Sequence, residues 1–152
     1  MIRRPPRSTL CISSAASDVY KRQENRQQTE VAIASMKLDR DEIWGSGDYE
    51  ALVAMIMIES PEGISNLQEI IQVPGVGVLF VGPTDMASYI NAAGPNAPQV
   101  EAMVQQVLAV CLESGIACGY PIVANSVDDA ERQKANRLEQ GFKVLAVMTR
   151  AR

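Results

Sequence analysis

The sequence predicts an α/β protein built on a parallel sheet. Four short apolar segments are rich in Val, Ile, Leu and Met and too short for typical helices: residues 53–58, 76–81, 116–122 and 142–148. Helical spacing of apolar residues separates them, and the strand-helix unit recurs about every thirty residues, which indicates parallel strands joined by right-handed crossovers. Strands that are apolar throughout are typical of sheets covered by helices. Periodicity alone leaves open whether this sheet is an open doubly wound sheet or part of a barrel.

Residues 1–23, MIRRPPRSTLCISSAASDVYKRQ, show neither a helical nor a strand period, and their Arg, Pro and Ser content predicts disorder. This stretch resembles translated sequencing-adapter segments at the ends of metagenome-derived reading frames, so we expect a non-native leader. A basic arm that binds phosphate is the alternative. A helix is expected over residues 25–38, with Val31, Ala34 and Leu38 on its apolar side.

Three helices have clear start signals. Ser60 is a predicted N-cap with Pro61 at the first helical position, and Ser126 begins a capping-box pattern. The longest apolar stripe begins after Pro98 and includes Cys111, which we therefore assign to the core. The segment from Met86 to Ile90 is expected to form a single helical turn.

An acidic residue follows each of the first two predicted strands, Glu59 after one and Asp85 after the other. Because the carboxyl ends of parallel strands meet at one edge of the sheet, we expect these two carboxylates to converge there. Carboxylate oxygens are the ligands that hard divalent cations prefer. The competing interpretation is that each acid only caps the helix that follows it, which is worth about 1 kcal/mol.

Composition excludes several classes of function. The formal net charge of −4 argues against a nucleic-acid surface, and no apolar run is long enough to cross a membrane. No G-x-G-x-x-G or Walker sequence is present, which argues against a nucleotide site. The chain has no His, and its three cysteines lack metal-type spacing. An odd number of cysteines favours a reducing compartment, so we expect a cytoplasmic protein.

The segment IMIESPEGISNLQEIIQVPGVGVLFVGPTDMA, residues 56–87, resembles the centre of the HpcH/HpaI aldolase and citrate lyase β-subunit family. That family includes the metal-dependent class II pyruvate aldolases. In it, a strand ends in Ile-Glu-Ser/Thr, a helix leads to Val-Pro-Gly-Val-Asp, and the next strand ends in Gly-Pro-x-Asp-Leu/Met. The likeness extends more loosely over residues 30–149. Gly77 departs from the family pattern, which has Asp there.

The resemblance implies a partial (β/α)8 TIM barrel, roughly strands five to eight with their helices, so residues 24–152 are expected to be the C-terminal half of an aldolase barrel. It implies that Glu59 and Asp85 bind Mg²⁺ or Mn²⁺ and that the backbone around Gly82, Pro83 and Thr84 holds the pyruvate carboxylate. The His base and the substrate-binding Arg of the family belong to the earlier half. No catalytic side chain is therefore assigned in this chain.

The function implied is metal-dependent cleavage of a 4-hydroxy-2-oxo acid to pyruvate and an aldehyde by the parent enzyme, a small-molecule lyase that is expected to be a homo-oligomer. This shorter chain is itself expected to be inactive. Two alternatives stay open: a citryl-CoA or malyl-CoA lyase-like enzyme, and a catalytically dead fragment that binds a metal weakly.

Overall fold

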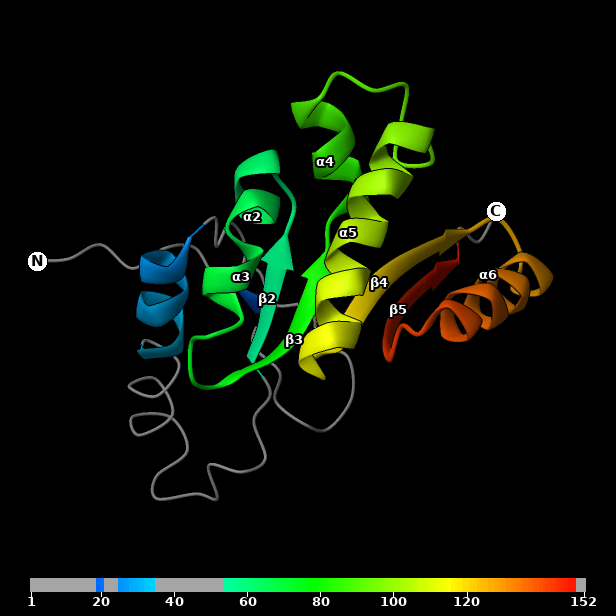
Figure 1. The fold of residues 1–152 in the computed structure, drawn as a ribbon. Helices are drawn as coiled ribbons and strands as arrows, with labels where there is room; N and C mark the ends of the chain where they lie inside the picture. The colour runs from blue at the N-terminus through cyan, green and yellow to red at the C-terminus, as the bar shows by residue number, and fades with distance from the viewer. Residues whose placement is uncertain (1–18, 21–24, 35–53, 150–152) are drawn as a thin grey trace, which may run out of the picture.

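A computed structural model describes residues 19–20, 25–34 and 54–149. Its centre is a five-stranded, fully parallel sheet in the order β1-β2-β3-β4-β5. The strands are β1 (Val19–Tyr20), β2 (Ala54–Ile58), β3 (Val76–Val81), β4 (Ala117–Ala124) and β5 (Val144–Thr149). The four strands predicted from the sequence are confirmed, and the strand order follows the chain order (Figure 1).

Strand β1 corrects one expectation. Val19 and Tyr20 lie in the segment expected to be disordered, yet they pair in parallel with Met55 and Ile56 of β2. The physical reason is that β2 would otherwise present an unpaired backbone edge, which any short extended segment can satisfy. The rest of residues 1–23 lies outside the described residues, and a non-native origin of this segment stays a prediction.

Helices form the connections between successive strands from β2 to β5. They are α2 (Pro61–Ser65), α3 (Leu67–Ile70), α4 (Pro83–Tyr89), α5 (Pro98–Ser114) and α6 (Val127–Gln140). Helix α5 lies in front of β3 and β4, whereas α4 lies at the end of β3 (Figure 1). The helix expected after Ser60 is divided into α2 and α3 at Asn66, which has φ −100° and ψ 8°.

Residues 26–34 form a further helix, as expected, but its buried side is not the predicted one. Val31 is 60% exposed and Ala34 is exposed, whereas Ala32 and Ile33 are buried; Leu38 lies outside the described residues. The orientation is set by a tertiary contact: Ile33 belongs to the core and lies against Gly75. A weak helical stripe could not reveal this contact.

One apolar layer holds the helices to the sheet. Alternate strand residues such as Ile56, Leu79 and Ile122 pack there with Val104 of α5. Cys111 is buried in the same layer, as predicted, and so is Cys118. Successive strand residues point to opposite faces. The intervening positions therefore point to the second face of the sheet, away from this layer.

Among the helices that the structure describes, none has the length and apolar character needed to cross a membrane.

Candidate functional site

Glu59 is the first residue after β2, at the carboxyl edge of the sheet, and it is only 5% exposed. It continues the alternation of Met55 and Met57, so its side chain points to the face opposite the helix layer. It does not cap the next helix. The N-cap of α2 is Ser60, whose Oγ accepts a hydrogen bond of 3.1 Å from the backbone N–H of Gly63. The capping alternative therefore fails for Glu59.

The Glu59 side chain packs against Gly82. Ile58 pairs with Val81, and the N–H of Gly82 donates to the carbonyl of Ile58 at 2.9 Å. A Cβ placed on Gly82 would lie 2.7 Å from the Glu59 Cβ and 3.3 Å from its Oε2. The Glu59 carboxylate therefore lies directly over the glycine that begins the second predicted motif.

Asp85 has a different place from the one that its sequence position suggested. Helix α4 begins at Pro83, so Asp85 lies in its first turn and not at the end of a strand, and it is exposed. The helix begins earlier than the predicted turn at Met86 because Pro83 has the φ of a first helical residue. Gly82 and Asp85 are about one turn apart, roughly 5 Å along the helix axis. Asp85 thus lies at the same edge of the sheet as Glu59.

The backbone expected to hold a substrate carboxylate offers fewer donors than the motif suggested. The N–H of Gly82 is bound to Ile58, and Pro83 has no N–H. Both residues are buried, whereas Thr84 is exposed. Of the three predicted residues, Thr84 is the one whose N–H belongs to the first turn of a helix, where intrahelical acceptors are lacking.

The two predicted metal ligands at this edge are both carboxylates, Glu59 and Asp85. Within the described ranges, no group of three or more His, Cys, Asp or Glu side chains is placed to hold a metal ion. Two carboxylates from consecutive strand-helix junctions fit Mg²⁺ or Mn²⁺, since such ions take oxygen ligands and keep positions for water or substrate. They do not fit a structural zinc site, which needs four nitrogen or sulfur ligands.

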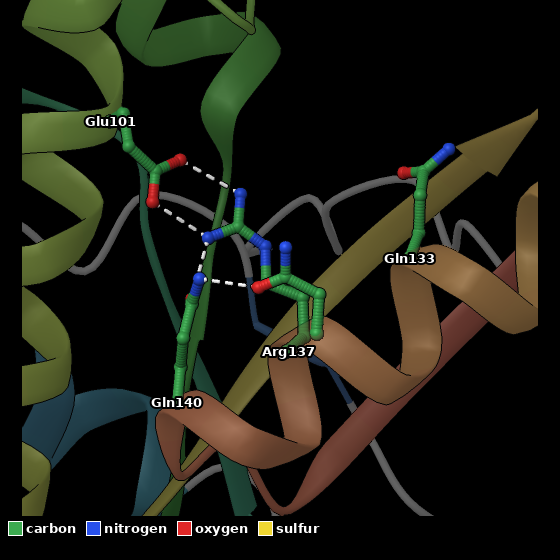
Figure 2. A pocket seen from close by; sticks show the side chains of 5 residues that line it. Glu101, Gln133, Arg137 and Gln140 are labelled. Atoms are coloured by element: carbon green, nitrogen blue, oxygen red, sulfur yellow. Dashed lines mark hydrogen bonds and ion pairs between the residues drawn. The ribbon is translucent and has the colours of Figure 1, made fainter.

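A surface pocket of about 340 Å³ lies elsewhere, between α5 and α6 (Figure 2). It is lined by Glu101, Gln133, Asn136, Arg137 and Gln140. Arg137 points at the Glu101 carboxylate and pairs with it, so the charges that line this pocket neutralise each other. This pocket is on the helix side of the sheet, whereas Glu59 points to the opposite face, and we do not assign the active site to it.

The contact between Gly82 and Glu59 was not foreseen from the sequence. The motif indicated Gly82 only as part of a backbone loop. The pairing of the two adjacent parallel strands places Glu59 beside Gly82 once their register is known. This register is set by tertiary pairing, however, and cannot be read from the sequence alone.

Comparison with known proteins identifies relatives over most of the chain. The family model described as HpcH/HpaI aldolase/citrate lyase matches residues 14–147, a range that begins inside the expected leader. A hydroxypyruvate/pyruvate aldolase of Chromohalobacter salexigens is 32% identical over 117 residues, which cover 72% of this chain and 44% of that protein. A 4-hydroxy-2-oxo-heptane-1,7-dioate aldolase of Escherichia coli is 35% identical over 100 residues, 64% of this chain and 36% of that one. The chain thus spans less than half the length of these relatives.

Solved structures agree in fold. A HpcH/HpaI aldolase/citrate lyase family protein from Burkholderia cenocepacia superposes with a TM-score of 0.68 at 20% identity, over 88% of this chain and 58% of the other. The citrate lyase β subunit from Mycobacterium tuberculosis gives 0.61 at 13% identity, over 87% and 55%. The parallel sheet and its helices are therefore a partial, TIM-barrel-like α/β fold. That they correspond to strands five to eight stays a prediction. With a match over residues 14–147, the chain belongs to the HpcH/HpaI aldolase/citrate lyase family.

Proposed function

We propose that this chain carries the metal-binding part of a class II aldolase that cleaves a 4-hydroxy-2-oxo acid to pyruvate and an aldehyde. The observation that carries the proposal is the buried Glu59 carboxylate, which does not cap α2 and lies over Gly82 at the edge that also holds Asp85. The sequence relatives support the choice, since those named above act on pyruvate or on a 4-hydroxy-2-oxo acid.

In this proposal Glu59 and Asp85 hold a divalent cation, Mg²⁺ or Mn²⁺. Such an ion, when bound, polarises the carbonyl of a 2-oxo acid and stabilises the negative charge that develops when the carbon–carbon bond breaks. The burial of Glu59 shields this ligand from water, whereas the exposure of Asp85 leaves the site open toward solvent and substrate. The two carboxylates therefore have different roles: Glu59 holds the cation in place, and Asp85 completes the ligand set on the side that is open to solvent.

Thr84 is proposed to meet the carboxylate of the 2-oxo acid through its backbone N–H. It precedes Asp85 directly, so the substrate carboxylate and the cation would lie side by side. Gly82 and Pro83 shape this part of the site without donating, since the Gly82 N–H is used within the sheet. This proposed arrangement suits a 2-oxo acid, which offers a carbonyl and a carboxylate oxygen on adjacent carbons.

The first test measures binding of Mn²⁺ to the full 152-residue chain by electron paramagnetic resonance. Glu59→Ala is expected to weaken binding by at least about tenfold, because it removes one of two charged ligands. The matched control is Glu62→Ala, which removes an exposed carboxylate three residues away in the first turn of α2. Equal Mn²⁺ affinity in Glu59→Ala and the unaltered chain would contradict the metal site.

The second test measures pyruvate release from a 4-hydroxy-2-oxo acid with and without Mn²⁺. Release that requires Mn²⁺ and disappears in Glu59→Ala supports the aldolase. Release that persists without a metal contradicts it. Mn²⁺ binding without any release means that this chain by itself binds metal but does not catalyse.

A further inference from the structure

The absence of a side chain at Gly82 determines where the Glu59 carboxylate can lie. The Glu59 Cβ occupies space that a Cβ on residue 82 would need, at 2.7 Å, a separation that real Cβ atoms essentially never show. The second close atom is Oε2 of the same carboxylate, at 3.3 Å. Both the Cβ and the carboxylate of Glu59 thus lie against Gly82.

Neither partner is free to move apart from the other. The Gly82 N–H is tied to the Ile58 carbonyl at 2.9 Å, and Ile58 directly precedes Glu59. The conflicting atom is a Cβ, which moves only with its backbone. An added methyl group at position 82 therefore has to displace the end of β2, and the Glu59 carboxylate with it. The φ of Gly82, −112°, is one that alanine also adopts, so the effect is steric and not conformational.

A second pair on the same face also leaves no room for a Cβ on its glycine, and it contains no carboxylate. The Phe80 ring lies over Gly119 of β4, where a Cβ would be 2.3 Å from the ring carbon Cδ2. Phe80 pairs with Gly119 in the sheet and precedes Gly82 by two residues. This pair provides a control in which the same substitution, at the strand position paired with Phe80, creates a clash with a side-chain ring and not with a Cβ.

We propose that Gly82 is a positioning residue for the cation site. Because Gly82 has no side chain, the Glu59 side chain can lie against its Cα, and this contact orients the Glu59 carboxylate toward the metal. This inference rests on the proposed function and changes the role expected for Gly82. The resemblance implied that its backbone binds the substrate, but its N–H is engaged with Ile58. The role that remains is to leave room for Glu59.

The test compares three glycine-to-alanine variants of the full chain by Mn²⁺ affinity and by melting temperature without metal. Gly82→Ala is expected to weaken Mn²⁺ binding by about 10–100-fold, the usual effect of losing a group that orients a ligand. Gly119→Ala is expected to lower the melting temperature but to leave Mn²⁺ affinity within about twofold of the unaltered chain, because the atoms nearest to a Cβ at residue 119 belong to Phe80 and not to a proposed ligand. Gly94→Ala, with no atom within 4 Å, is expected to change neither.

Unchanged Mn²⁺ affinity in Gly82→Ala would overturn the proposal, as would an equal loss of affinity in Gly119→Ala, since that would indicate general loosening of the sheet. Glu59→Gln separates this outcome from failure of the proposed function. If Glu59→Gln binds Mn²⁺ like the unaltered chain, the metal site itself is wrong. If Glu59→Gln loses binding and Gly82→Ala does not, only the positioning role is wrong.

A stability cycle keeps the proposal testable even if Gly82→Ala folds poorly. Glu59→Gly removes the Cβ that would clash. The drop in melting temperature caused by Gly82→Ala is therefore expected to disappear when Glu59→Gly is also present. A drop of the same size in both backgrounds would show that the alanine clashes with something other than Glu59, and would overturn the proposed positioning role of Gly82.

Discussion

Removal of the Arg137 guanidinium is expected to loosen the attachment of α6. Arg137 donates from Nη1 and Nη2 to the two carboxylate oxygens of Glu101 in α5, each at 2.7 Å, and from Nη1 to Gln140 at 2.9 Å (Figure 2). Its guanidinium carbon lies 3.9 Å from the centre of the Tyr120 ring in β4. One side chain thus connects α5, α6 and the sheet.

The magnitude depends on how far the pair is screened from water. The Arg137 side chain is 15% exposed, but that of Glu101 is 37% exposed, so the pair lies between a surface and a buried ion pair. After discounting for screening, the two charge-assisted hydrogen bonds contribute about 1–2 kcal/mol to the free energy of unfolding. Stacking on Tyr120 adds about 1 kcal/mol. Arg137→Ala is therefore expected to cost about 2–3 kcal/mol.

Urea unfolding at pH 7, followed by circular dichroism, measures this loss. Arg137→Lys is expected to lose about half as much, because lysine keeps the charge but not the planar two-pronged geometry. The matched control is Arg132→Ala on the same helix, whose 80% exposed side chain is expected to contribute little. A free energy of unfolding for Arg137→Ala within about 0.5 kcal/mol of the unaltered chain would refute the reasoning, since it would place the pair among exposed ones.

Two further predictions concern acid stability and a helix end. The hydrogen bonds from Arg137 lower the pKa of Glu101 below its usual value of 4.5, so the pair stabilises the fold above that pH and the stabilisation is lost as the pH falls through the lowered pKa. Urea titrations between pH 7 and 3 should thus show a smaller decline for Glu101→Gln than for the unaltered chain, and equal declines would contradict this. Gly115 ends α5 with φ +75° and no neighbouring atom within 4 Å, so Gly115→Ala should cost about 1–2 kcal/mol through backbone strain alone. Thermal unfolding measures it, and a loss no larger than that of Gly94→Ala would be the contrary result.

Local chemistry in the sequence was sufficient for most helix starts and stops. Ser126 caps α6 as predicted, with its Oγ accepting from the N–H of Asp129 at 3.1 Å, and Gly115 and Gly141 are left-handed at the ends of α5 and α6. These features depend on residues within one helical turn. For that reason they can be deduced before any fold is known.

Predictions failed where a long-range contact outweighed a local pattern. Val31 was expected inside and is exposed, because the packing of Ile33 on Gly75 decides which side of its helix is buried. Strand β1 was missed because Val19–Tyr20 has no strand pattern of its own and gains its conformation from the edge of β2. Both outcomes depend on segments that lie far from each other in the chain.

By itself, the sequence determined the order of β2 to β5 and of the helices between them, and the two acids that follow β2 and β3, because hydrophobic period and helix-capping chemistry are local properties. The tertiary structure decided that Glu59 is buried over Gly82 whereas Asp85 is exposed in the first turn of α4. It also decided that Arg137 joins α5 to α6. These relations arise from strand register and from which side chains share a face, and both are set only when distant segments pack together.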